Sequence, residues 1–242
     1  MPLTLTTTIT HTTTTTFMAD ATGWLAGLQQ ADSFFPGGSM AFSWGLEALQ
    51  HAGYVKDADS LAVFVEAQAL ERWASLDQGI VCAAWRAESF DAWCEVDATA
   101  EAVTLAAPMR EGARRLGRTL ADVHARLGLP LAAQIRAAIG EGHTPGHLPA
   151  VQGAIWRVLG IGEDHARAIS AHTACTGAVS SAVRLGIVGH LDAQRVLSGL
   201  RPQLAAVLDA PAPSLDALWS NTFAADIATM RWQRHDARLF AN

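Results

Sequence analysis

The chain has a single lysine, Lys56, among its 242 residues, and that scarcity excludes several classes of site. No phosphate-binding loop of the form G-x-x-x-x-G-K-[ST] can be written in the sequence, nor any Ser-x-x-Lys nucleophile pair. Lysine and arginine together number 17 against 23 aspartates and glutamates, the formal charge is -6, and no extended basic block occurs. Nucleic acid is therefore not an expected partner.

Cysteine is also scarce. Cys82, Cys94 and Cys175 are widely spaced within apolar stretches and form no C-x-x-C pair, which favours buried thiols in a reducing compartment. No run of about twenty apolar residues could span a bilayer. The N-terminus lacks the basic start and apolar core of a secretory signal. We expect a cytoplasmic protein that does not enter a membrane.

Helical patterns fill most of the chain. Threonine dominates the beginning of the sequence, where too few apolar residues occur to offset the entropy of ordering, so residues 1–19 are expected to be a flexible tail. In residues 20–242, alanine and leucine recur throughout and strand-type alternation is absent. Glycine and proline breaks divide this part into roughly eight to ten helices, which predicts an all-α fold formed by a single helical bundle.

The most informative local pattern is DSFFPGGSMAFSWGLE at residues 32–47. Pro36 restricts the residue before it, and Gly37 and Gly38 permit unusual backbone angles. One interpretation is a relaxed G-x-S-x-G nucleophile elbow with Ser43 as the nucleophile. That elbow requires a preceding strand and a parallel sheet, whereas this chain is predicted to be helical. The pattern instead indicates a constrained loop that presents side chains to a binding partner.

Three further patterns could contact a ligand or a partner. His143 and His147 flank Thr-Pro-Gly, which prevents the helical i,i+4 geometry of a metal site, so we expect solvated loop histidines. The segment from Met230 onward is apolar and rich in arginine, and it either docks back on the body or is ordered by a partner. Arginines spaced by three or four residues form either a solvated face or a docking edge for an acidic partner. These are Arg110, Arg114, Arg115 and Arg118.

Four blocks follow one another in an order that a known family shares. Residues 28–47 follow the pattern L-Q-L-A-(D/S)-x-x-(F/L)-P-x-G-x-F-x-x-S-x-G-L-E, with Met40 where the family often has phenylalanine and Phe42 where tyrosine is frequent. The matching residues include Leu28, Ala31, Asp32, Phe35, Pro36, Gly38, Ser43, Gly45, Leu46 and Glu47. Residues 109–120 are similar to R-E-x-R-x-x-G-x-x-L, and residues 182–194 to A-x-x-x-L-x-P-L-G-Q-x-x-x-Q. The chain closes on R-L-F at residues 238–240. In these blocks it resembles the UreF urease accessory proteins.

The resemblance implies an all-α homodimer without catalysis of its own that helps nickel reach urease. Such a protein bridges the scaffold protein UreD or UreH and the GTPase UreG, in a complex that docks on apo-urease. No cofactor is expected in the chain itself, because the wider complex handles nickel. The alternative is a diverged helical bundle that binds nickel directly or has an unrelated interaction role. The partner-binding residues implied by the resemblance are Pro36, Gly38, Phe42, Ser43, Gly45, Glu47, Arg110, Gln194, Arg238, Leu239 and Phe240.

Overall fold

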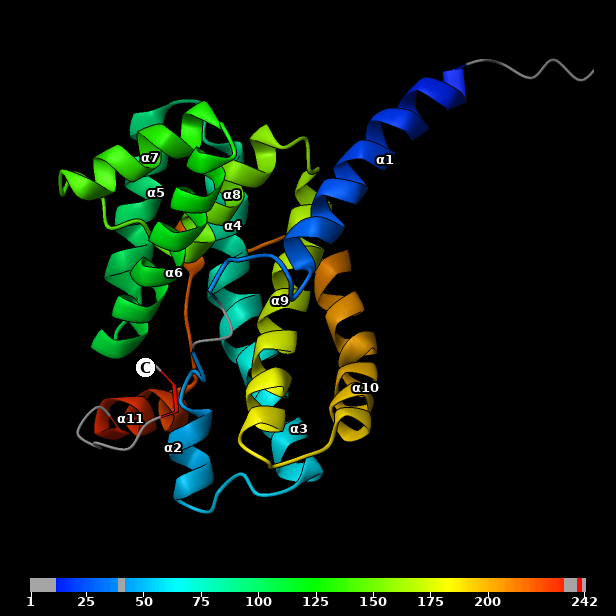
Figure 1. Cartoon of the computed structure of the whole chain (residues 1–242), viewed down its shortest axis with the longest axis vertical. Helices are drawn as coiled ribbons and strands as arrows, with labels where there is room; N and C mark the ends of the chain where they lie inside the picture. The colour runs from blue at the N-terminus through cyan, green and yellow to red at the C-terminus, as the bar shows by residue number, and fades with distance from the viewer. Residues whose placement is uncertain (1–11, 39–41, 233–238, 241–242) are drawn as a thin grey trace, which may run out of the picture.

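The computed structural model describes residues 12–38, 42–232 and 239–240, with side chains described from residue 21 onward (Figure 1). Its elements, in chain order, are α1 (Thr12–Ala31), α2 (Leu46–His51), α3 (Ala58–Gln68), η2 (Ala69–Asp77), α4 (Gln78–Arg86), α5 (Phe90–Val103), α6 (Ala107–Arg126), α7 (Pro130–Gly140), α8 (Leu148–Val158), α9 (Glu163–Arg184), α10 (His190–Asp209), η3 (Leu215–Ala217) and α11 (Phe223–Trp232).

The all-α prediction is confirmed, since the described residues contain no β-strand. The elements α3, η2 and α4 follow one another without a break, so they form one continuous rod. With this rod counted once, the described part of the chain has ten α-helices, within the predicted eight to ten. None of the described helices has both the length and the apolar character needed to cross a bilayer.

Helix α1 begins at Thr12, inside the segment that we predicted to be a flexible tail. Residues 1–11 lie outside the described residues, and the flexibility of residues 1–19 stays a prediction. The Thr12 end of the helix lies away from the body, and the C-terminal part of the helix contacts the body near the start of α9 (Figure 1). Glycine allows the close approach there, because a Cβ on Gly23 would lie 2.5 Å from the Gly160 carbonyl oxygen and one on Gly27 would lie 2.4 Å from Ile169.

Local sequence signals explain where several helices begin. Asp57 caps α3 by accepting a hydrogen bond from the Ser60 N–H at 2.9 Å, and the Ser60 hydroxyl in turn accepts from the Asp57 N–H at 3.1 Å. Ser89 caps α5 in a similar way. Prolines occupy the first turns of α6, α7 and α8, where the missing N–H costs no hydrogen bond.

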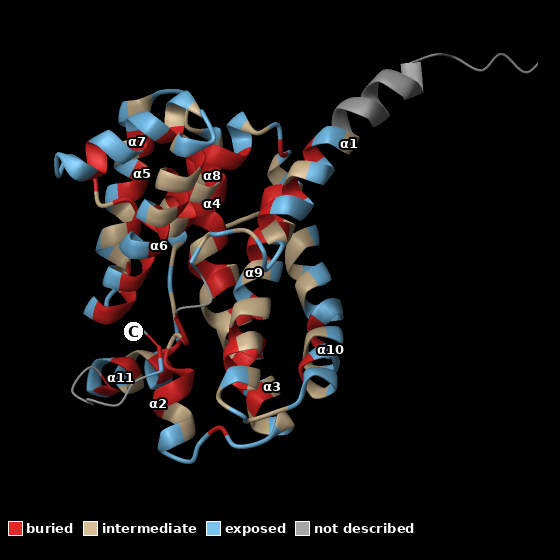
Figure 2. Cartoon of the chain, in the orientation of Figure 1, coloured by how far each residue is buried: buried red, intermediate tan, exposed pale blue. Residues whose placement is uncertain are grey.

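Two apolar clusters form the interior. The first core lies among α4 to α8 and includes Ile80, Ile135 and Ile155. The second core lies among α2, α3, α9, α10 and α11 and includes Leu61 and Val179. Figure 2 shows buried residues concentrated along α4, α8 and one side of α9, whereas α7 and α10 are largely exposed. Helix α9 contributes residues to both cores and therefore joins the two halves of the bundle.

The rod is π-helical at its centre, over Ala69–Asp77. A crossing segment near η3 pairs with this stretch, since the Asn221 N–H donates to the Glu71 carbonyl at 2.8 Å and the Trp219 N–H donates to the Ser75 carbonyl at 3.2 Å. Carbonyl groups of the widened helix are thus satisfied from outside it.

Candidate functional site

Phe42 lies where the first two family-like blocks meet. Its ring is 2% exposed, and a Cβ on Gly112 of α6 would lie 3.1 Å from it. The ring stacks on Trp44 with centroids 5.6 Å apart, and the Arg115 guanidinium lies 5.9 Å from the Phe42 centroid. The Ser181 hydroxyl of α9 donates to the Phe42 carbonyl at 3.2 Å. The loop before α2 is therefore fixed against both α6 and α9.

The next two residues form a turn with unusual backbone geometry. Trp44 has φ 54° and Gly45 has φ 91°, both in the left-handed region. That conformation costs a residue with a Cβ roughly 1–2 kcal/mol, so Trp44 is strained. A Cβ on Gly45 would also lie 2.7 Å from the Ala225 carbonyl oxygen and 2.8 Å from the Thr229 hydroxyl of α11. Only glycine at position 45 lets α2 and α11 pack this closely.

Ser43 has a structural place in this turn. It is fully buried, and its hydroxyl oxygen accepts a hydrogen bond from the Glu47 N–H at 3.4 Å. The described residues contain no strand or sheet that could form a nucleophile elbow around it. The geometry of Ser43 is that of a residue that supports the first turn of α2.

Glu47 connects this turn to the end of the chain. Its carboxylate is buried, with the residue 5% exposed, and it accepts hydrogen bonds from the backbone N–H groups of Leu239 at 2.6 Å and Phe240 at 3.3 Å. The Phe240 ring is also buried, and the Arg184 guanidinium lies 4.5 Å from its centroid. The described end of the chain therefore docks back on the body, which was one of the two alternatives. Arg238 lies outside the described residues.

Arg110 and Gln194 do not join this cluster. The Arg110 guanidinium donates to the carbonyls of Thr104 at 2.8 Å and Leu105 at 2.7 Å, and it pairs with Glu101 at 3.4 Å. It thereby holds the C-terminal end of α5. Gln194 is exposed on α10, which packs mainly on α9 and α3. The structure thus separates these two predicted residues from the turn at Phe42.

Pro36 and Gly38 lie in the approach to the same turn. Pro36 is exposed, and Gly38 has φ 77°, which favours glycine. A Cβ on Gly38 would lie 3.5 Å from both Leu116 and Thr119 of α6. The approach loop therefore lies against the second family-like block.

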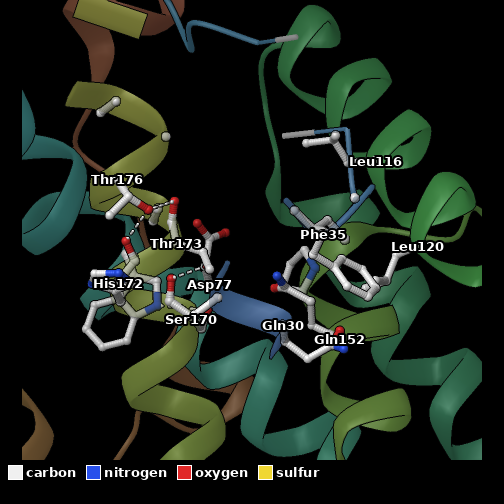
Figure 3. Close-up of a pocket in the computed structure, with 18 of the residues that line it drawn as sticks. Gln30, Phe35, Asp77, Leu116, Leu120, Gln152, Ser170, His172, Thr173 and Thr176 are labelled. Carbon is white, nitrogen blue, oxygen red and sulfur yellow. Dashed lines mark hydrogen bonds between the residues drawn. The ribbon is translucent and has the colours of Figure 1, made fainter. Parts of the chain in front are cut away.

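A cavity of about 480 Å³ lies beside this loop, between α9 and η2 on one side and α6 and α8 on the other. Figure 3 shows His172, Thr173 and Thr176 of α9 facing Phe35, Leu116 and Leu120. Burial lowers the pKa of His172, and the positive charge of Arg201 lowers it further, so the imidazole is neutral near neutral pH. The cavity walls therefore combine apolar surface with hydrogen-bonding groups.

The prediction of solvated loop histidines is wrong for His147. Its side chain is 1% exposed, and its Nε2 lies 2.8 Å from a carboxylate oxygen of Glu101. Burial lowers the pKa of His147 although Glu101 opposes the shift. Asp97 holds the loop that carries His147 against the body. This carboxylate is fully buried and accepts hydrogen bonds from the Thr144 hydroxyl at 2.5 Å, the Gly146 N–H at 2.6 Å and the His147 N–H at 2.7 Å. His143 is exposed, as predicted.

The arginine edge of α6 serves partly as an internal brace. Arg114 forms an ion pair with Glu101, as Arg110 does, while Arg115 lies over Phe42. Arg118 is exposed. In the part of the chain that the structure describes, no group of three or more histidine, cysteine or carboxylate side chains could hold a metal ion.

Known proteins resemble this chain over most of its length. The family model for UreF matches residues 55–201. The urease accessory protein UreF of Trichodesmium erythraeum is 32% identical over 231 residues, covering 93% of this chain and 99% of the relative. That of Rhizobium etli is 35% identical over 211 residues, covering 85% and 90%. That of Actinobacillus pleuropneumoniae serotype 5b is 28% identical over 218 residues, covering 88% and 96%.

The chain belongs to the UreF family. The resemblance inferred from the sequence is thereby confirmed, and the relatives are named as urease accessory proteins. Arg110 and Gln194 lie within the range matched by the UreF model, whereas Phe42, Glu47 and Phe240 lie outside it. Sequence reasoning missed Arg184 and Asp97, whose contacts depend on residues far away in the chain.

Proposed function

We propose that this UreF family member is a cytoplasmic, homodimeric adaptor for nickel insertion into urease. It bridges a UreD- or UreH-type scaffold protein and a UreG-type GTPase, and the complex docks on apo-urease. In this role the chain performs no catalysis and needs no cofactor of its own, because the wider complex handles nickel.

The observation that carries the proposal is the convergence of segments that are distant in sequence around Phe42 and Glu47. The approach loop, α6, the end of α9 and the end of the chain meet there through Arg115, Ser181 and Phe240. Rigid aromatic and arginine side chains are enriched in the energetically important parts of protein interfaces. The cluster is buried at Phe42, Glu47 and Phe240, so it holds the family-like blocks in a fixed arrangement, and this supports a role in presenting them to partners.

The test is co-purification with the UreD/UreH-type and UreG-type proteins of the same host. The wild-type chain should form a stable complex, and a variant truncated before Arg238 should bind at least about tenfold more weakly. The matched control lacks only Ala241 and Asn242 and therefore keeps the segment that contacts Glu47; it should bind like the wild type. Absence of a complex under every nucleotide and nickel condition would contradict the proposal.

Direct nickel binding remains a separate, testable alternative. It requires stoichiometric binding of Ni²⁺ to the isolated chain, which isothermal titration calorimetry measures. The adaptor role requires no such binding by this chain alone. Tight binding of one ion per chain would favour the alternative.

A further inference from the structure

A second hollow lies among α2, α3 and α11. This α2–α3–α11 groove has a volume of about 700 Å³ and is bounded by Leu49, Tyr54, Val63, Phe64, Ile227 and Arg231. Figure 1 shows α2 and α11 side by side, with α3 close to the lower end of α9. The volume falls within the range of protein sites that enclose apolar groups.

The groove exposes large apolar side chains to solvent. Tyr54 is 75% exposed, Val63 69% and Ile227 44%, and the neighbouring Phe223 and Met230 of α11 are 58% and 45% exposed. Single exposed apolar residues are ordinary, but a cluster around one hollow is characteristic of an interaction site. Its lining comes largely from three helices, and apolar grooves between helices are a common binding place for an amphipathic helix.

Among the described residues that line the groove, Arg231 carries the only permanent charge. The other ionisable side chains of this described lining are Tyr54 and His51, and none of its members is a carboxylate. The two basic groups lie at the same end, because the His51 ring stands 4.8 Å from the ring of Trp232, which follows Arg231. Arg231 is exposed and forms no salt bridge among the described residues. Acidic side chains outnumber basic ones in the whole chain, so this basic end is a local feature.

We propose that the α2–α3–α11 groove binds an amphipathic α-helix of a partner protein, whose apolar side chains fill the groove while one of its carboxylates pairs with Arg231. Ile227 and Arg231 are four residues apart on α11 and therefore share one face. A partner helix that carries an apolar residue and an acidic residue one turn apart could contact Ile227 with the first and pair with Arg231 through the second. The inference rests on the proposed function, since the scaffold protein and the GTPase are the partners to be tested.

The experiment places opposite charges at one position of the groove. Ile227→Glu and Ile227→Lys remove the same apolar contact, but only glutamate repels the carboxylate of the partner. Arg231→Gln removes the pairing charge. Dissociation constants are measured for the full-length chain with the scaffold protein alone and with the GTPase alone. Leu127→Glu is the matched control, since Leu127 is 68% exposed outside the groove.

For one of the two partners, Ile227→Glu should weaken binding at least about tenfold, and by more than Ile227→Lys does. Arg231→Gln should weaken the same complex and reduce its sensitivity to salt, while Leu127→Glu should bind like the wild type. Circular dichroism melting curves show that each variant is folded before its binding is measured.

Other outcomes overturn the inference. If the wild-type chain binds its partners and every groove variant binds them with the same dissociation constant, the groove is not the binding site, while the adaptor role is unaffected. Equal losses for glutamate and lysine reject the acidic helix. A change in the molar mass of the chain alone, with partner affinities unchanged, assigns the groove to a second copy. Absence of any wild-type complex rejects the proposed function and this inference together.

Discussion

The carboxylate of Glu47 accepts a hydrogen bond from the backbone N–H of Phe240, 193 residues further along the chain. Both residues are buried, and the same carboxylate also binds the Leu239 N–H. Hydrogen bonds to an ionised acceptor are stronger than neutral ones. The first turn of α2 and the end of the chain are consequently linked, and a change in either should be felt by the other.

Replacing Glu47 with glutamine tests this link. The amide of Glu47→Gln would direct a donor at one of the two backbone N–H groups, so we expect a loss of roughly 1–3 kcal/mol in the free energy of unfolding. The amide protons of Leu239 and Phe240 should also exchange faster with solvent. Urea unfolding and hydrogen exchange measure the two effects. Glu88→Gln, at an exposed carboxylate, should change neither, and unaltered exchange in Glu47→Gln would refute the link.

Gly45→Ala tests the close packing of α2 against α11. Alanine at a positive φ costs roughly 1–2 kcal/mol in any case. Gly53→Ala is the control for this backbone cost, since Gly53 has φ 79° and a Cβ added there would have no atom within 4 Å. At Gly45 the Cβ would also meet the Ala225 carbonyl oxygen at 2.7 Å. We expect Gly45→Ala to lose at least about 1 kcal/mol more than Gly53→Ala in urea unfolding. Equal losses would show that the two helices can separate without cost.

The protein should become less stable as the pH falls, because it contains buried histidines. Burial lowers the pKa of His124 and of His147 below the ordinary value of 6.5. The folded state therefore binds these protons more weakly than the unfolded state does. Their contribution to stability is complete above pH 6.5 and is lost as the pH falls from 6.5 toward the lowered pKa values. The free energy of unfolding, measured by urea denaturation, should therefore decline as the pH is lowered from about 7.5 to about 5.5.

His124 is the clearer of the two, because burial is the only cause of its shift. Its ring is 3% exposed, and its Nε2 lies 3.0 Å from the Gln30 side-chain oxygen. A His124→Gln variant should show a shallower decline of the free energy of unfolding over the same pH interval. An undiminished decline would mean that other groups govern the pH dependence.

Sequence reasoning succeeded where the signal was local. Helical periodicity and glycine or proline breaks determine the all-α class. The first family-like block contains Phe42 and Glu47, both of which are buried, and their role in partner binding stays a prediction. The partner of Glu47 could not be predicted, because the carboxylate reaches a backbone 193 residues away. His147 was mistaken for a solvated residue, because its burial depends on Asp97, 50 residues earlier. The spacing of the arginines left a solvated face and a docking edge open for Arg110, and it could not predict that Arg110 binds the backbone carbonyls at the end of α5.

The π-helical stretch Ala69–Asp77 has a consequence for how this family can diverge. It joins α3, which places Leu61 and Val65 in the second core, to α4, which places Ile80 and Val81 in the first. One residue turns a helix by roughly 100°, so deleting a single residue here would rotate one set of side chains away from its core. Homologues should therefore conserve the number of residues between Val65 and Ile80.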